Sequence, residues 1–173
     1  MFSGRVSSVR CALIMTLGFG CAALLQGETV AKLPQADRIV IIKSQHSMTL
    51  MKNGSPIKIY KVALGKSSGR KERQGDHKTP EGLYVVDQKN AQSRFHLALH
   101  ISYPNADDRR RALAAGVSPG GAIMIHGVEK EFAWLGSMEH DIDWTDGCIA
   151  VTDPEIEEVW RLVPVGAPVE IRP

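Results

Sequence analysis

Short runs of alternating or β-branched apolar residues dominate the chain from residue 38 onward, and they predict a protein built mostly of strands. Arg38 to Lys43 and Met48 to Lys52 are two such runs, and Pro56 to Leu64 alternates apolar with polar side chains. Asn53-Gly54, between the second and third runs, is a strong signal for a two-residue turn. The pattern therefore predicts one strand followed by a β-hairpin.

The later part of the chain continues the strand pattern and adds two short helices. We expect further strands at Leu83 to Val86, His96 to Ser102, Ala122 to Ile125 and Pro168 to Ile171. Asp107 to Ala115 carries acids in its first turn and stops at Gly116, which predicts a helix. Thr152 to Glu155 (TDPE) predicts a capped helix that continues to about Val163. About seven strands, two helices and no repeat predict one mainly β (α+β) domain of two packed sheets.

The first residues follow a different pattern. Cys11 to Leu25 is an uninterrupted apolar run, and the preceding Met1 to Arg10 contains basic residues but no acid. The run is shorter than the ~20 residues of a membrane-spanning helix, and polar residues follow it at once. We therefore predict a signal peptide over residues 1–31, cleaved after Ala31, and a single exported domain over residues 32–173.

Composition argues against a nucleic-acid partner and identifies one candidate functional residue. The chain has 173 residues, of which 43% are hydrophobic and 23% charged, as is usual for a folded globular domain. Its 21 basic and 19 acidic side chains create no field of one sign, so we expect no nucleic-acid partner. Two of the three cysteines lie in the predicted signal peptide, which leaves Cys148 alone. A lone cysteine in an exported domain is a buried apolar residue, half of an intermolecular disulfide, or a reactive thiol.

The neighbours of Cys148 favour a reactive thiol. Cys148 follows a turn-forming Asp-Gly pair, and such a turn exposes a nucleophile beside backbone N–H groups that can stabilise an oxyanion. A thiol also needs a base, and His126 stands at the end of a predicted buried strand, just before Gly127. Zinc binding by His126 and Cys148 with His100 or His140 is the alternative, but the spacing is a poor zinc pattern, so we expect no metal.

Three separated motifs resemble the L,D-transpeptidases, cell-wall enzymes with the YkuD-type catalytic domain. His126-Gly127 and Thr145 to Ile149 (TDGCI) resemble the family signature, and Gly75 to Gly82 (GDHKTPEG) is similar to its Gly-Asp-Gly-Lys-Thr-Pro-Glu-Gly loop. The resemblance extends over nearly all of the predicted domain. It implies a YkuD-like β-sandwich of mixed sheets with a few short helices, located in the periplasm or cell envelope.

The resemblance also implies a role for each matching residue. Cys148 would attack the carbonyl between the third and fourth residues of a peptidoglycan stem tetrapeptide and expel D-alanine, with His126 as the base. The carbonyl of Gly127 would hold the second ring nitrogen of His126, and the N–H groups of Gly147 and Cys148 would form the oxyanion hole. An amine would resolve the acyl-enzyme as a cross-link or a protein attachment, and water would hydrolyse it. The implied partners are stem peptides and a wall-attached lipoprotein; we expect a monomer without a cofactor.

The chain departs from the family pattern in three places. Asp146 replaces a histidine that is often found there, and its charge would raise the pKa of Cys148. Ala150 replaces an arginine or asparagine, and the lid from Val128 to Trp144 is long. These features resemble a branch of YafK/DpaA-type proteins, some of which cut a diaminopimelate–protein link. The alternatives are therefore a hydrolase that uses the same acyl-enzyme, or a catalytically silent wall-binding module.

Three further side chains are candidates for substrate contact. His100 and Tyr103 line a substrate groove in one interpretation, whereas strand alternation equally allows His100 to face the surface. Trp144, with Trp134 in the same lid, packs over the acyl chain or sugar, or else anchors the lid to the core.

Overall fold

The structure is a computed structural model that describes residues 1, 35–129 and 141–173. The predicted signal peptide beyond Met1 lies outside the described residues, as does Trp134 of the predicted lid. No helix among the described residues has both the length and the apolar character needed to cross a bilayer.

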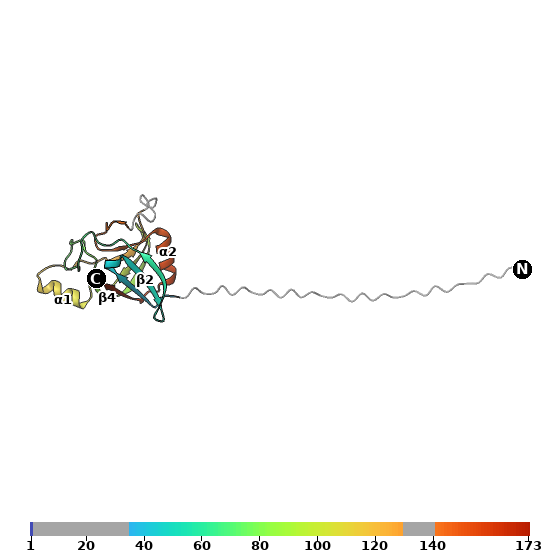
Figure 1. The fold of residues 1–173 in the computed structure, drawn as a ribbon, viewed down its shortest axis with the longest axis horizontal. Helices are drawn as coiled ribbons and strands as arrows, with labels where there is room; N and C mark the ends of the chain where they lie inside the picture. The colour runs from blue at the N-terminus through green and yellow to red at the C-terminus, as the bar shows by residue number, and fades with distance from the viewer. Residues whose placement is uncertain (2–34, 130–140) are drawn as a thin grey trace. The chain divides into compact units, whose positions relative to one another are not determined.

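Within the described residues the chain forms eight strands and two α-helices (Figure 1). The strands are β1 (Arg38–Ile42), β2 (Ser47–Lys52), β3 (Ser55–Lys61), β4 (Gly82–Ser93), β5 (His96–Ile101), β6 (Met124–His126), β7 (Ile149–Ala150) and β8 (Pro168–Arg172). The helices are α1 (Ala106–Ala114) and α2 (Asp153–Leu162), with a short 3₁₀ helix, η1 (Lys43–Gln45), after β1. Figure 1 shows α1 and α2 at opposite ends of the strands.

The strands follow the order β3-β2-β1-β8-β4-β5-β6-β7 and form two sheets that share the long strand β4. Residues 82–85 of β4 pair with β8, and residues 86–93 belong to the segment that pairs with β5. The β1–β8 and β6–β7 pairs are parallel, and the other pairs are antiparallel. The predicted mainly β fold with mixed sheets is therefore confirmed.

Local sequence signals account for several elements. Asn53 and Gly54 have φ angles of 50° and 77°, the left-handed geometry that a tight hairpin turn needs. Helix α2 begins with a capping box in which Thr152 and Glu155 bond each other's backbone N–H groups. β4 is longer than the predicted run at Leu83 to Val86, because its polar second half becomes a strand by pairing with β5.

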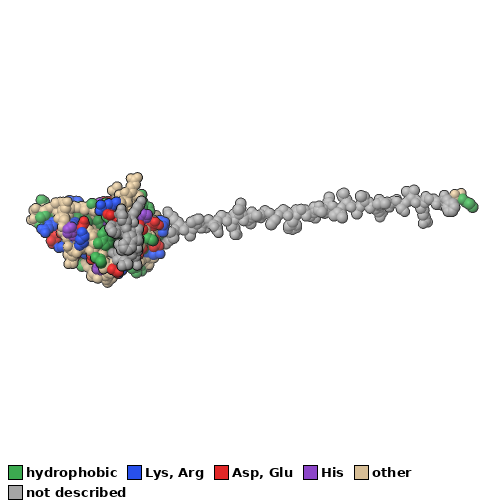
Figure 2. Space-filling view, turned by 90° about the horizontal axis from the view of Figure 1, so that it is seen from above, with side chains coloured by type: hydrophobic (Ala, Val, Ile, Leu, Met, Phe, Trp, Pro, Cys, Tyr) green, Lys and Arg blue, Asp and Glu red, His purple; other side chains and the backbone are tan. Residues whose placement is uncertain are grey.

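One continuous core lies between the sheets and α2. The buried side chains of α2 are spaced along one face of the helix, and α2 packs on β5. Fully buried members include Ile39, Ile41, Met48, Leu50, Val86, Leu99, Ile101, Ile125, Ile149, Ile156 and Val159. On the surface, acidic and basic side chains are interspersed over the face seen in Figure 2. The core therefore provides a rigid base for the strands that carry the candidate site.

Side-chain alternation in β5, β6 and β7 separates the core from a second face. Leu99, Ile125 and Ile149 are in register across the three strands and are fully buried in the core. Their chain neighbours point the opposite way, and there His126 is in register with Ala150. The candidate residues therefore lie on the face of these strands that is opposite the packed core.

The short strand β7 is bonded on both sides. It runs parallel to β6 on one side, and on the other Ala63 and Ala150 exchange two backbone hydrogen bonds of 3.0 and 2.9 Å. The N–H of Thr145 then donates to the carbonyl of Leu64 at 3.1 Å. The segment after β3 therefore meets β7 and fixes the chain on both sides of Cys148.

Candidate active site

His126 ends β6 and is almost fully enclosed, with 2% of its surface exposed. Its Nδ1 donates to the carbonyl oxygen of Gly127 at 2.6 Å, which leaves Nε2 as the unprotonated nitrogen of the neutral ring. Phe95 stacks on the imidazole at a centroid distance of 4.3 Å, and Trp144 meets it edge-on at 5.8 Å. Burial lowers the pKa of His126 to about 4; the Gly127 bond opposes this change, and the charge of Arg94 adds to it. His126 is therefore a neutral, oriented base at neutral pH.

Gly127 has no room for a side chain. A Cβ there would lie 2.5 Å from Oδ1 of Asp153 and 3.1 Å from the carbonyl oxygen of Phe95. The same Asp153 oxygen accepts the N–H of Val128 at 2.9 Å. Helix α2, which begins at Asp153, therefore holds the backbone whose carbonyl orients His126.

Thr145 organises the turn that leads to Cys148. Its hydroxyl accepts the N–H of Gly147 at 3.1 Å and donates to the carbonyl of Cys148 at 2.8 Å. Gly147 has a φ of 123°, and a Cβ there would lie 2.6 Å from the carbonyl oxygen of Lys78. The turn therefore needs a hydroxyl at residue 145 and a glycine at residue 147.

The expected oxyanion hole is incomplete in this conformation. The N–H of Gly147 donates to the hydroxyl of Thr145 inside the turn. The N–H of Cys148 has no acceptor in the part of the chain that the structure describes. One of the two predicted donors is therefore engaged in this structure, and sequence spacing does not reveal that the threonine hydroxyl binds it.

Cys148 is half-buried immediately before β7, with its sulfur against the start of β6. Its Sγ donates to the carbonyl of Ala122 at 3.7 Å, and the N–H of Met124 hydrogen-bonds the sulfur. Because His126 is in register with Ala150, Cys148 lies diagonally across the β6–β7 pair from His126. The structure thus places the two candidates, which are distant in sequence, at the end of β6 and immediately before the neighbouring strand β7.

The surroundings of Cys148 keep its thiol protonated. Burial raises the pKa of Cys148, and the charge of Asp146 raises it further, as expected from the sequence. The N–H of Met124 and the ammonium of Lys71 act in the opposite direction and only partly offset this increase. The resting pair is therefore a thiol beside a neutral imidazole, rather than a thiolate beside an imidazolium.

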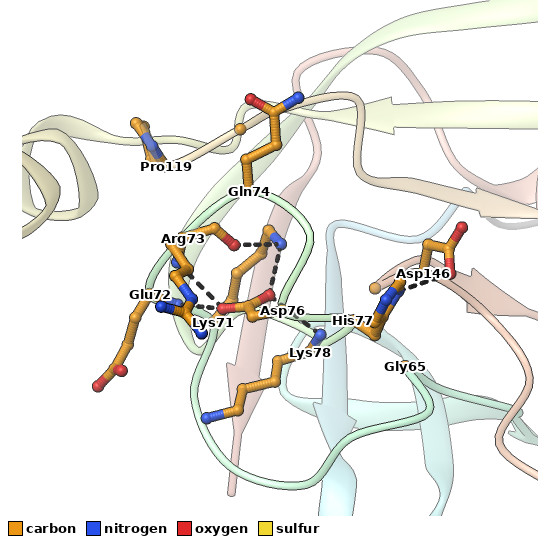
Figure 3. Close-up of polar contacts among 12 residues, drawn as sticks. Gly65, Lys71, Glu72, Arg73, Gln74, Asp76, His77, Lys78, Pro119 and Asp146 are labelled. Atoms are coloured by element: carbon orange, nitrogen blue, oxygen red, sulfur yellow. Dashed lines mark hydrogen bonds and ion pairs between the residues drawn. The ribbon is translucent and has the colours of Figure 1, made fainter. Parts of the chain in front are cut away.

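The loop before β4 is organised by the carboxylate of Asp76 (Figure 3). Asp76 accepts the N–H groups of Glu72 and Arg73 at 2.8 and 3.0 Å, the N–H of Lys78 at 3.2 Å, and the ammonium of buried Lys71 at 2.8 Å. Burial alone would raise the pKa of Asp76, but these donors hold it well below its usual range. Asp76 therefore remains charged and fixes the shape of the loop.

This loop contacts both the Cys148 turn and the segment that precedes β6. The carbonyl of Lys78 packs against Gly147, and the N–H of Gln74 donates to the carbonyl of Ser118 at 2.8 Å. Gly120 also packs closely on Gln74, near the segment whose Ala122 contacts the thiol. The loop therefore spans from the turn before Cys148 to the segment that precedes β6.

An ion-pair cluster connects the loop to residue 146. Oδ1 of Asp146 lies 2.8 Å from Nδ1 of His77 and 3.0 Å from Nζ of Lys66. The hydrogen bond from Lys66 lowers the pKa of Asp146, burial opposes this change, and the hydrogen bond from His77 lowers the pKa further. His77 occupies the place of a glycine in the resembled loop and has a φ of 55°, the left-handed region that glycine adopts freely. Sequence reasoning missed His77 and Lys66, although the replaced glycine was a usable signal.

The substrate-contact candidates have different positions. His100 is in register with Met124, on the same face as His126, and its Nδ1 lies 2.5 Å from a carboxylate oxygen of Asp87. Tyr103, by contrast, is buried in the core, and its hydroxyl donates to the carbonyl of Pro119 at 2.9 Å. Tyr103 therefore does not line a groove, because the chain turns inward after β5.

Trp144 and Phe95 form the aromatic cover of His126, with their ring centroids 6.2 Å apart. The sequence identified Trp144 but gave no indication of Phe95, which lies in the hairpin between β4 and β5. Across residues 35–129 and 141–173, no group of three or more His, Cys, Asp or Glu side chains is arranged to hold a metal ion.

Known proteins share the sequence family and the fold of this domain. Residues 36–171 match the YkuD family, described as the L,D-transpeptidase catalytic domain. YafK of Escherichia coli strain K12, which carries the name of an L,D-transpeptidase, is 34% identical over 97 residues. The aligned part is 55% of this chain and 32% of YafK, so the chain matches about a third of that relative.

Solved structures show the same fold. The helical cell shape determining protein Pgp2 of Campylobacter jejuni superposes with a TM-score of 0.62 at 24% identity, over 80% of this chain and 48% of Pgp2. L,D-transpeptidase 3 of Mycobacterium tuberculosis, solved with a faropenem-derived adduct, gives 0.56 at 16% identity, over 80% of this chain and 60% of that one. With the family matched over nearly all of the described residues, this chain belongs to the YkuD family of L,D-transpeptidase catalytic domains.

Proposed function

We propose that this chain is an exported cysteine acyltransferase that acts on peptidoglycan stem peptides in the periplasm, with Cys148 as the nucleophile. The observation that carries the proposal is the pairing of two strands: β6 delivers an oriented His126 beside the turn that presents Cys148. We assign residues 1–31 to the signal peptide and residues 32–173 to the catalytic domain. Stem peptides are the donor substrate, and D-alanine is the leaving group.

In the acylation step, Cys148 attacks the carbonyl before the terminal D-alanine while Nε2 of His126 takes the thiol proton. The same proton passes to the departing amine, and the acyl group remains on sulfur as a thioester. The N–H of Cys148 is free to donate to the oxyanion, and Gly147 joins it only if substrate binding releases Thr145. Because both resting groups are neutral, proton transfer accompanies attack instead of preceding it.

The acyl-enzyme has two fates that share all of these residues. Attack by an amine gives a cross-link or a protein attachment, which makes the chain a transferase. Attack by water gives a hydrolase, including one that cuts a diaminopimelate–protein link. The 34% identity to YafK, together with that relative's transpeptidase name, favours transfer as the first candidate.

The test measures D-alanine release from a purified stem tetrapeptide and the mass of the protein during the reaction. We expect a covalent adduct on Cys148, and we expect Cys148→Ala and His126→Gln to abolish both signals. His96→Asn is the matched control for histidine loss, because His96 pairs with Glu157 and is not a candidate for substrate contact. Full D-alanine release by Cys148→Ala would refute the proposal, and failure of a carbapenem to acylate Cys148 would favour a silent wall-binding module. Adding an amine acceptor to one sample and a lipoprotein-linked muropeptide to another separates transferase from hydrolase.

A further inference from the structure

We propose that the His77–Asp146 pair is a second base in this site, which takes the proton from the incoming primary amine when the acyl-enzyme is resolved. The inference rests on the proposed function, because it concerns the second half of that reaction. It assigns separate proton-transfer roles to two histidines, with His126 in acylation and His77 in acyl transfer.

The hydrogen bond between the pair defines which nitrogen of His77 is free. A carboxylate accepts hydrogen bonds only, so Nδ1 of neutral His77 carries the proton that it donates to Oδ1 of Asp146 at 2.8 Å. Nε2 is then unprotonated, and it has no partner among residues 35–129 and 141–173. The His77 side chain is 46% exposed, so this free nitrogen is open to a molecule arriving from solvent. A carboxylate-oriented imidazole with a free nitrogen is the arrangement of a general base.

The pair is placed beside Cys148 by backbone on both sides. Asp146 precedes Cys148 by two residues, in the turn held by the Thr145 hydroxyl. The carbonyl of Lys78, the residue after His77, packs against Gly147, as the 2.6 Å separation from a Cβ built there shows. Figure 3 shows the imidazole and the carboxylate facing each other between the two loops. These backbone contacts therefore hold the His77–Asp146 pair next to the turn that precedes Cys148.

The backbone at His77 is also fixed. Its carbonyl accepts the N–H of Ser67 at 3.1 Å, and it packs so closely on Gly65 that a Cβ there would lie 2.3 Å away. Its φ of 55° is unusual for a residue with a side chain, so a bulky residue is held here in a conformation that favours glycine. These contacts hold the imidazole next to Asp146.

His126 and His77 differ in their access to an amine that arrives from solvent. His126 is 2% exposed, and Phe95 and Trp144 enclose its ring. An amine acceptor is an ammonium ion in neutral solution and must lose a proton to attack, so a base that is open to solvent is suited to receive it. Asp146 remains ionised because Lys66 and His77 both bind it. The exposed pair is therefore more accessible to an acceptor from solvent than the enclosed His126 is.

The transfer step balances as follows. The amine nitrogen, after losing its ammonium proton to solvent, forms a bond to the thioester carbonyl carbon and passes one N–H proton to Nε2 of His77. The carbon–sulfur bond breaks, and the electron pair goes to the sulfur of Cys148. The sulfur is reprotonated from the imidazolium of His77 through solvent, which restores the resting thiol and the neutral ring. No oxidant, reductant or metal takes part in this sequence.

The central experiment substitutes His77→Asn. Asparagine tolerates the left-handed backbone and can donate an amide N–H to Asp146, but it has no basic nitrogen. His96→Asn is the matched control, because His96 also has a positive φ, of 65°, and its Nε2 lies 2.9 Å from a carboxylate oxygen of Glu157. In the full chain, acylation by a stem tetrapeptide is followed by intact mass, and the decay of the adduct is then followed after addition of diaminopimelate.

We expect His77→Asn to form the adduct at a rate within about twofold of the unmodified protein. Its transfer to diaminopimelate should fall by about tenfold or more, as for loss of a general base. His96→Asn should leave both rates unchanged. His77→Gly should lose transfer in the same way and regain part of it with added imidazole, which a merely structural role would not allow.

Transfer by His77→Asn at the unmodified rate would overturn the inference, because the pair would then only tie the two loops together. Equal losses in acylation and transfer would overturn it too, as would slower hydrolysis with unchanged amine transfer. Absence of any adduct in the unmodified protein refutes the proposed function itself and the inference with it, and is thus distinct from the other outcomes.

Discussion

Replacement of Thr145 by valine tests whether one hydroxyl holds the turn before Cys148. Valine keeps the shape and β-branching of threonine but removes the oxygen that accepts from Gly147 and donates to Cys148. Thr145 is 3% exposed, so the N–H of Gly147 would lose its partner in a place that water reaches poorly. An unsatisfied buried donor costs about 1–3 kcal/mol, and the second lost bond about 1 kcal/mol. We therefore expect Thr145→Val to lower the free energy of unfolding by about 2–4 kcal/mol.

Urea denaturation followed by tryptophan fluorescence measures this change, because the unfolding free energy falls linearly with urea concentration. Thr145→Ser retains the hydroxyl and should lose less than Thr145→Val. Thr49→Val, at a half-buried threonine in β2, is the control and should change stability by about 0.5 kcal/mol or less. If Thr145→Val matched the unmodified protein in stability, or if the serine variant lost more than the valine variant, the hydroxyl would not be the element that holds the turn.

Three further predictions follow from the site. Gly147→Ala should destabilise the protein by about 2 kcal/mol or more in urea denaturation and abolish acylation, because its Cβ would meet the carbonyl of Lys78, whereas Gly121→Ala, with open space around it, should be neutral. The pKa of His126 is lower in the folded protein than its unfolded value of about 6.5, so the neutral buried ring contributes stability that is fully present above pH 6.5. That stability, of the order of 3 kcal/mol, should be lost as pH falls from about 6.5 to 4, and His126→Phe should abolish the loss over this window. The carboxylate of Asp76 contributes stability that is lost only below about pH 4. Asp76→Asn should therefore remove the loss of stability below pH 4, and it should increase hydrogen exchange in residues 71–78.

Local signals predicted the hairpin at Asn53-Gly54 and the capped start of α2 because each depends on a few neighbouring residues. The mixed sheet was predictable from strand patterns and from the family resemblance. The strand order was not, because the place of β8 between β1 and β4 depends on pairing between segments distant in the sequence. The full length of β4 was missed for the same reason, since its polar second half is a strand only beside β5.

The candidate site was likewise predictable where it depends on local motifs and not where it depends on contacts between distant segments. His126, Cys148 and the Gly127 carbonyl came from motifs, and the structure brings them together by parallel pairing of β6 with β7. Phe95 and Asp153 could not be found from the sequence, because they reach the site from another hairpin and from the first turn of α2. The engagement of Gly147 by Thr145 needs atomic geometry, and no residue pattern encodes it.

The two-sided bonding of β7 also has a consequence for the order of folding. The contact between Ala63 and Ala150 joins parts of the chain that are far apart in sequence, and contacts of this kind form slowly because a long loop must first close. The surroundings of Cys148 therefore do not exist until that closure is complete. The rate at which its thiol becomes protected from an alkylating reagent during refolding should match the rate of global folding. Protection of Cys148 therefore reports on the folding of the whole domain.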